Sequence, residues 1–263
     1  MSHGTVAVTR EGVISRVTLN RPDIRNAFND QMLEDLLEAF ETIRDDPSVR
    51  VVILTGEGKA FCAGADLHWM KRVLEYTYEQ NYEDSLRLAR MLHTIYSCPK
   101  PVIGRINGHA IGGGTGMVAV CDITIAAESA VFAFSETKLG LTPATISPYL
   151  LKRMGERPLR ELFLTGERFS GQRAVELGLV DRVVPLDELD KAVDEKVDLL
   201  LTSGPDALAV SKELIRGIGE RSLDDNGPYT AEVIARCRMS DEGQEGMNAF
   251  LDKRKPNWFP KDT

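Results

Sequence analysis

The sequence predicts an α/β protein in which alternating strands and helices are followed by helices alone. Three observations support this fold class. β-Branched runs such as Val49–Thr55 are typical of fully covered strands, amphipathic helical patterns lie between the strands, and no strand pattern follows Val184. We therefore expect a βα core over residues 1–185 and a helical C-terminal region over residues 186–263, with no flexible linker between them.

The first elements are a hairpin and a helix. Residues Thr5–Thr9 and Val13–Leu19 alternate with period two around Glu11-Gly12, a pattern that predicts two half-buried strands. After Asn29, apolar residues recur at helical spacing, so a helix is expected to run from Asp30 to about Arg44.

The remaining elements follow from apolar runs and helical periodicity. Strands are expected at Pro101–Ile106, Asp122–Ala126, Val131–Phe134 and Asp181–Val184. Core helices are expected at Tyr82–Tyr96, Gly114–Cys121, Ser147–Met154, Leu159–Leu164 and Gly171–Leu177. The C-terminal region should contain helices at Leu186–Leu201, Asp206–Ile218, Thr230–Met239 and Glu242–Arg254.

Composition excludes several classes of function. The formal net charge of −8 over 263 residues disfavours nucleic acid or an anionic membrane surface as the main partner. The four cysteines lack CxxC spacing and no apolar leader opens the chain, so we expect a cytoplasmic protein without disulfides. The four histidines show no metal-ligand spacing and no apolar run reaches about 20 residues, so neither a metal nor a membrane span is expected.

Two loops rich in glycine and alanine, Phe61–Leu67 and Gly108–Thr115, are the strongest chemical signal. Each follows an expected strand. Glycines in such loops often mark only a tight turn. The second loop has P-loop spacing, but Gly114 stands where the lysine belongs, and a dinucleotide fingerprint starting at Gly114 would begin too far from its strand. Neither alternative explains the first loop.

A third interpretation is an oxyanion hole formed by main-chain N–H groups. The Gly113 N–H would lie at the start of a helix, where donors have no partner within the helix, and the Ala65 N–H could converge on the same oxygen. Small residues in both loops would let a substrate carbonyl approach the backbone.

Two carboxylates are candidates for a role at these loops: Asp66, which lies in the first loop, and Glu136, which follows the expected strand Val131–Phe134. Phe132, Phe134 and Leu139 surround Glu136 in sequence, and burial among them would raise its pKa toward the range that suits a group taking and returning a proton. Asp66, just before Leu67, is better explained as a turn or helix cap.

These motifs resemble the crotonase, or enoyl-CoA hydratase/isomerase, superfamily over nearly the whole chain. The resemblance is carried by Asn20–Pro22, Arg25–Ala27, Phe61–Leu67, Lys100–Ile103, Asn107–Gly114, Cys121–Ile123, Leu164–Gly166, Ala174, Gly178–Val180 and Phe250–Pro256. It implies a spiral of ββα units with a helical C-terminal region, assembled as trimers or pairs of trimers.

The resemblance also implies roles for particular residues. Ala65 and Gly113 would supply the oxyanion N–H groups, and Glu136 matches the second of two family glutamates. The first glutamate is replaced by Gly116. The implied substrate-binding residues are Arg25, Ala27, Ala63, Asp66, Leu67, His68, Trp69, Ile111, Gly112, Pro143, Ile146, Phe250 and Lys253. Trp69 and Ile146 would either line the acyl pocket or fill the core.

The expected function is hydration of an α,β-unsaturated acyl-CoA, with no cofactor beyond the coenzyme A of the substrate. The stretch Phe134–Tyr149 is most similar to the methylglutaconyl-CoA hydratase type of leucine degradation, whose acidic acyl group would need a cation such as Lys71, Arg72 or His68. Alternatives are a Δ3,Δ2-enoyl-CoA isomerase and a non-catalytic acyl-CoA-binding protein; an RNA-binding member is disfavoured by the acidic charge.

Overall fold

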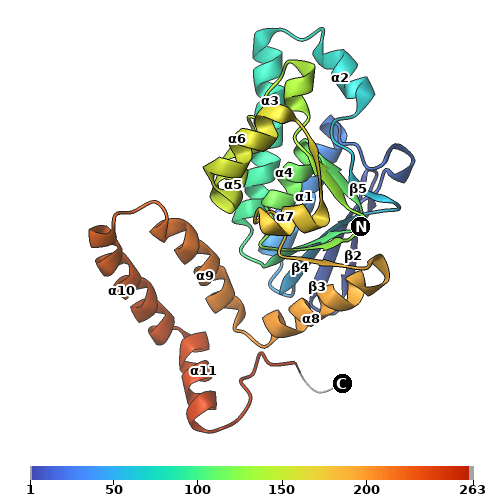
Figure 1. Cartoon of the computed structure of the whole chain (residues 1–263). Helices are drawn as coiled ribbons and strands as arrows, with labels where there is room; N and C mark the ends of the chain where they lie inside the picture. Colours follow the sequence, from blue (N-terminus) through green and yellow to red (C-terminus); the bar gives the residue numbers. More distant parts are fainter. Residues whose placement is uncertain (1, 261–263) are drawn as a thin grey trace. The chain divides into compact units, whose positions relative to one another are not determined.

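The structure is a computed structural model that describes residues 2–260 (Figure 1). The chain divides into two compact units. The core unit comprises the residues up to Cys98 together with Val102–Asp194, and the helical unit comprises Pro99–Pro101 and the residues from Glu195 onward. The two units are described separately below.

A seven-stranded sheet forms the larger layer of the core unit. Its strands, in spatial order, are β1 (Ser2–His3), β2 (Val6–Glu11), β3 (Ile14–Leu19), β4 (Val51–Gly56), β6 (Val102–Ile106), β8 (Ile123–Ala127) and β11 (Arg182–Val184). The first three strands pair antiparallel, which confirms the predicted hairpin, and those from β3 to β11 pair parallel. Every residue of β4 is buried, as expected for its β-branched run.

A second, four-stranded sheet carries the candidate site. Its order is β10 (Arg168–Ser170), β9 (Val131–Ala133), β7 (His109–Ile111) and β5 (Ala60–Cys62). The strands β5, β7 and β9 are parallel, so their carboxyl ends meet at one edge. Of these four strands only β9 was expected, from the run Val131–Phe134. The strands β5, β7 and β10 are three residues long and too short to show periodicity in sequence.

Apart from α2, for which no range was predicted, the α-helices of the core unit overlap the predicted ranges. They are α1 (Asp30–Asp45), α2 (Leu67–Val73), α3 (Tyr78–Ser97), α4 (Gly113–Ala119), α5 (Ser147–Met154), α6 (Glu156–Thr165) and α7 (Gly171–Glu176), with short 3-10 helices η1 (Pro22–Ile24), η2 (Glu136–Leu139) and η3 (Leu186–Glu188). Helix α3 begins before the expected Tyr82 because Thr77 and Gln80 form a capping box.

Helix α8 (Leu189–Leu201) leads into the helical unit, which contains α9 (Pro205–Ile218), α10 (Leu223–Met239) and α11 (Asp241–Leu251). Helix α10 begins earlier than the expected Thr230 because Ser222 caps it, even though Pro228 lies inside. The expected helix to Arg254 ends at Leu251, and Lys253 has a positive φ of 56°. Within residues 2–260, no helix has the length and apolar character that a membrane span requires.

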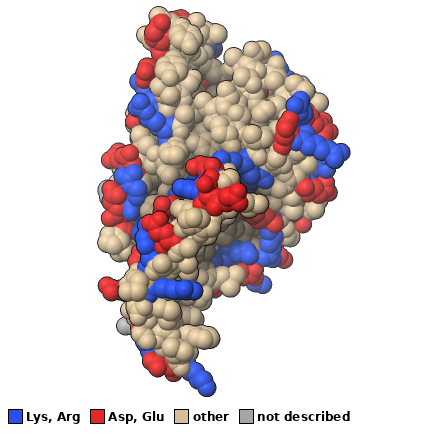
Figure 2. Space-filling model, turned by 90° about the vertical axis from the view of Figure 1, so that its left-hand side faces the viewer, with Lys and Arg blue, Asp and Glu red and all other residues tan. Residues whose placement is uncertain are grey.

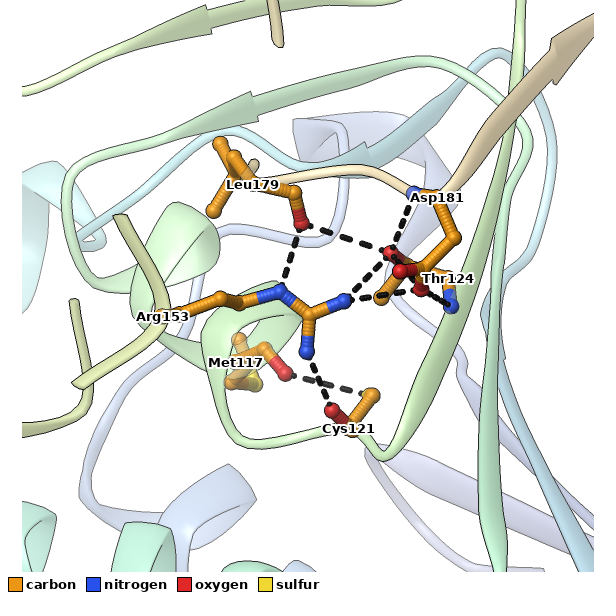
Figure 3. Close-up of polar contacts among 6 residues, drawn as sticks. All are labelled: Met117, Cys121, Thr124, Arg153, Leu179 and Asp181. Carbon is orange, nitrogen blue, oxygen red and sulfur yellow. Dashed lines mark hydrogen bonds and ion pairs between the residues drawn. The ribbon is translucent and has the colours of Figure 1, made fainter. Parts of the chain in front are cut away.

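Arg153 on α5 fixes the far end of α4 to the larger sheet (Figure 3). Its guanidinium donates to the carbonyl oxygens of Leu179 and Cys121 at 2.8 and 2.7 Å, to Thr124 Oγ1 at 2.8 Å and to Asp181 Oδ2 at 2.9 Å. Because several donors of one planar group are satisfied at once, the arrangement is geometrically specific. Helix α4 therefore presents its first residues to the site from a fixed base.

Charged side chains of both signs are interspersed over the face drawn in Figure 2. Such mixing is the ordinary pattern of a solvated surface. It differs from the concentrated basic stripe by which proteins bind a phosphate backbone.

Candidate active site

The two glycine- and alanine-rich loops lie side by side. Strands β5 and β7 pair in parallel, with Cys62 opposite Ala110. A Cβ on Gly64, whose φ is +96°, would lie 3.1 Å from the Ile111 carbonyl oxygen, and one on Gly114 would lie 2.6 Å from the Cys62 carbonyl oxygen. The backbones therefore approach too closely for larger residues, which explains the glycines at these positions.

The second loop presents the Gly113 N–H at the start of α4. The Thr115 and Gly116 N–H groups donate to the Gly112 carbonyl at 2.8 and 3.1 Å, and Thr115 Oγ1 donates to the Ala110 carbonyl at 2.7 Å. Gly113 is the first residue of the helix, so its N–H has no partner within α4. This N–H is available to a ligand.

The first loop presents the Ala65 N–H in a comparable way. The Ala63 N–H donates to the Arg25 carbonyl and the Asp66 N–H donates to the Phe28 carbonyl, both at 2.9 Å. Among the residues that the structure describes, the Ala65 N–H donates to none. The backbone on each side of Ala65 is thus held while its own donor is unused.

Glu136 is the first residue of η2, three residues after β9 ends. Its Oε1 atom lies against Gly112, where a Cβ would approach it to 2.9 Å, and φ of Gly112 is +53°. Its Oε2 atom is buried and has no hydrogen-bond partner within residues 2–260. Burial raises the pKa of the Glu136 carboxyl above its usual value of 4.5.

Asp66 is the N-cap of α2, which confirms the helix-cap interpretation. Its carboxylate accepts from the His68 and Trp69 N–H groups at 2.7 and 3.3 Å and pairs with Arg21 Nη2 at 2.8 Å. Burial alone would raise its pKa, but the His68, Arg21 and Trp69 donors outweigh burial and hold the pKa below its usual range.

Gly116 has no room for a side chain. A Cβ at this position would collide with Ile146 Cγ2, and Ile146 is buried with 1% of its side chain exposed. Trp69 is also buried; its ring lies 5.4 Å from that of Phe28, and its Nε1 donates to Asp84 Oδ1 at 3.3 Å. Both Ile146 and Trp69 belong to the hydrophobic core cluster of the core unit.

The other predicted binding residues fall into two groups. In the core unit, Arg25, Ala27 and Ala63 lie in and beside a turn bonded to the first loop, Leu67 and His68 are exposed at the start of α2, and Ile111 and Gly112 lead into α4, with Pro143 buried after η2. Phe250 and Lys253 belong to the helical unit, where Phe250 is 83% exposed. Arg72, a predicted cation, pairs with Asp30 at 2.9 Å.

Three residues beside the first loop were absent from the predicted set. Arg21 donates to the Ala27 carbonyl at 2.6 Å and forms an ion pair with Asp66. Asn26 is fully buried, has a positive φ of 56°, and donates to the carbonyls of Glu57 and Ala60 at 2.9 and 2.8 Å. Asparagine tolerates positive φ, so the residue type at position 26 could have indicated a turn from the sequence. The third residue, Phe28, has no sequence feature that marks it.

Known proteins resemble this chain in sequence and fold over almost its full length. Residues 9–261 match the family model described as Enoyl-CoA hydratase/isomerase. An enoyl-CoA hydratase from Shewanella pealeana superposes with a TM-score of 0.95 at 39% identity, covering 97% of this chain and 96% of that one. One from Mycobacterium smegmatis superposes with a TM-score of 0.91 at 35% identity, covering 97% and 98%.

A Dictyostelium discoideum protein named "Probable enoyl-CoA hydratase, mitochondrial" is 34% identical over 258 residues, which are 98% of this chain and 91% of that protein. The matched model, the level of identity and the shared architecture agree with one another. The chain belongs to the enoyl-CoA hydratase/isomerase family, the crotonase superfamily.

Proposed function

We propose that the protein hydrates an α,β-unsaturated acyl-CoA thioester at the edge formed by β5, β7 and β9. The observation that supports this most is the pair of unused N–H groups at Ala65 and Gly113 beside the half-buried Glu136 carboxylate, whose Oε2 atom is buried and has no hydrogen-bond partner within residues 2–260. N–H donors stabilise an oxyanion as charge develops, and removal of one typically costs about 2.7–4 kcal/mol. The relatives named as enoyl-CoA hydratases agree with this chemistry.

One carboxylate suffices for a syn addition. Ionised Glu136 takes a proton from water as the water oxygen bonds to Cβ of the substrate and the Cα–Cβ π electrons move into the thioester. The resulting enolate oxygen accepts the Ala65 and Gly113 N–H groups. Protonated Glu136 then returns the proton to Cα, which gives the 3-hydroxyacyl product and restores the carboxylate.

For coenzyme A, we propose the surface of the first loop. Arg25 and Ala27 lie beside Ala63, which bonds to the Arg25 carbonyl, and the exposed His68 is suited to the pantetheine or phosphates. Phe250 and Lys253, of this or a neighbouring subunit, would close the adenine end in a homotrimer or a dimer of trimers.

The acyl group is proposed to be branched and acidic, as in methylglutaconyl-CoA. Lys71 and His68 are exposed on α2, and Arg72 is already paired with Asp30, so Lys71 and His68 are the better candidates for a distal carboxylate. A panel of enoyl-CoA thioesters, with and without a distal carboxylate, tests this by comparing kcat/KM for hydration.

The absence of a side chain at Gly116 favours one second candidate, Δ3,Δ2-enoyl-CoA isomerisation. A single carboxylate beside an oxyanion hole can carry a proton between C2 and C4. Loss of absorbance of the conjugated thioester with formation of 3-hydroxyacyl-CoA supports hydration. Deuterium exchange at C4 without hydration would support isomerisation, and tight binding without either would indicate a non-catalytic acyl-CoA-binding protein.

A further inference from the structure

Phe28 lies between the two loops of the candidate site and contacts both. It follows the turn at Arg25–Ala27 directly and precedes α1, and only 3% of its side chain is exposed. Its backbone bonds to the first loop, while its ring packs on the second.

The backbone of Phe28 holds the first loop on both sides of Ala65. Its N–H donates to the Gly64 carbonyl and its carbonyl accepts from the Asp66 N–H, each at 2.9 Å, in an isolated parallel bridge between Phe28 and Ala65. In such a bridge Phe28 uses both its backbone N–H and its carbonyl, whereas Ala65 forms neither hydrogen bond itself. The bonds go to its neighbours Gly64 and Asp66. The geometry thus aims the Ala65 N–H away from Phe28 and leaves it free.

The ring of Phe28 packs against the second loop at Gly113. A Cβ placed on Gly113 would lie 2.6 Å from Cζ and 2.7 Å from Cε1 of the ring. The outer edge of the ring is therefore in direct contact with the Gly113 backbone, beside the second free N–H.

A second neighbour of the ring, Trp69, is also fixed. Trp69 packs on Phe28 with ring centroids 5.4 Å apart, and Trp69 is itself held by Asp84 of α3. Asp66 caps α2, which carries Trp69. Because interiors are close-packed, the contact with Trp69 restricts movement of the Phe28 ring.

We propose that Phe28 is a positioning residue that sets the separation of the Ala65 and Gly113 N–H groups. The proposal rests on the function proposed above, since the two groups matter only if one oxygen accepts from both. Donors must lie about 2.7–3.1 Å from that oxygen, so a displacement of about 1 Å at either loop weakens catalysis far more than substrate binding.

The test compares Phe28→Leu with Phe40→Leu. Phe40 is an equally buried phenylalanine of α1, so its substitution controls for loss of an aromatic side chain from the core. We expect F28L to lower kcat about 10- to 100-fold with KM within about threefold of wild type, whereas F40L keeps both within about threefold.

A spectroscopic measurement separates positioning from stability. An arylacryloyl-CoA bound to the wild type should show a red-shifted thioester absorbance, because the two N–H groups polarise its carbonyl. F28L should bind the same chromophore with a smaller shift, and F40L with the full shift. Phe28→Tyr, which keeps the ring but adds a hydroxyl at Cζ facing Gly113, should also reduce the shift and kcat, and it serves if F28L does not fold.

Two results would overturn the proposal, and they are distinguishable. If the wild type hydrates enoyl-CoA and F28L and F28Y retain full kcat and the full red shift, only the role of Phe28 is wrong. If the wild type binds the chromophore without a shift and neither hydrates nor isomerises enoyl-CoA, the proposed function fails and the role of Phe28 fails with it.

Discussion

Asp66 and Glu136 are two carboxylates at the same edge of one sheet, placed in opposite environments. Asp66 follows β5 and Glu136 follows β9, the two strands that flank β7. Three donors surround Asp66 and lower its pKa, whereas burial without a partner for Oε2 raises the pKa of Glu136. The satisfied carboxylate stabilises the loop, and the unsatisfied one is suited to carry a proton.

The largest expected effect is on catalysis by Glu136→Gln. The amide is nearly the same size but cannot take a proton from water, so kcat for hydration should fall by about 10³-fold with little change in substrate binding. Steady-state kinetics with a conjugated enoyl-CoA and a binding titration measure the two quantities. Asp66→Asn is the matched control and should retain most of kcat; equal losses in the two variants would erase the distinction between the carboxylates.

The next effect concerns the position of Glu136 rather than its charge. Gly112→Ala places a Cβ 2.9 Å from Glu136 Oε1 at a φ of +53°, so we expect kcat to fall about 10- to 100-fold as the carboxylate is displaced. Gly155→Ala is the control: its φ of +76° and ψ of 176° also lie outside the left-handed helical region, but no atom lies within 4 Å of the added Cβ. It carries the same kind of backbone strain without the contact, so a similar loss of kcat in both variants would assign the effect to strain alone.

The long elements of the fold were predictable from sequence because their patterns are local. Six-residue β4 is buried throughout and β-branched, and α1 has both an apolar face and the Asn29 cap. The short strands β5 and β7 were missed because three residues show no period. Their pairing depends on neighbours distant in sequence.

The candidate site was predictable to the extent that glycine and alanine mark it. Close approach of a neighbouring backbone or a positive φ requires glycine at Gly64, Gly112 and Gly114, so the glycines themselves are visible in the sequence. Phe28 leaves none, since an aromatic residue between a turn and a helix is ordinary core material until the fold brings Gly113 and Trp69 against it. The contact with Ile146 at Gly116 was hidden for the same reason.

A third prediction measures the structural role of Asp66. Asp66→Ala removes the cap of α2 and the partner of Arg21, so the free energy of unfolding should fall by about 1–2 kcal/mol in urea denaturation. Asn also caps helices, so Asp66→Asn should lose less. The native pKa of Asp66 is lowered, so its contribution as a carboxylate is present above its usual pKa of 3.8 and is lost as pH falls through the native value. The gap between wild type and D66N should therefore close in strong acid.

The smallest effect is on the stability of the fold at Glu136, whose pKa is shifted in the opposite direction to that of Asp66. Because its native pKa is raised, the folded protein binds this proton more tightly than the unfolded chain, and stability falls as pH rises from 4.5 through the native pKa. Above that range the native state holds a half-buried charge with an unpartnered Oε2 atom, so Glu136→Gln should melt about 1–2 °C higher than wild type near pH 8, with the difference vanishing in acid. Calorimetry at both pH values measures it. A Glu136→Gln variant that melts below wild type at pH 8 would mean that the ionised carboxylate has found stabilising partners in the folded protein and resembles Asp66 after all.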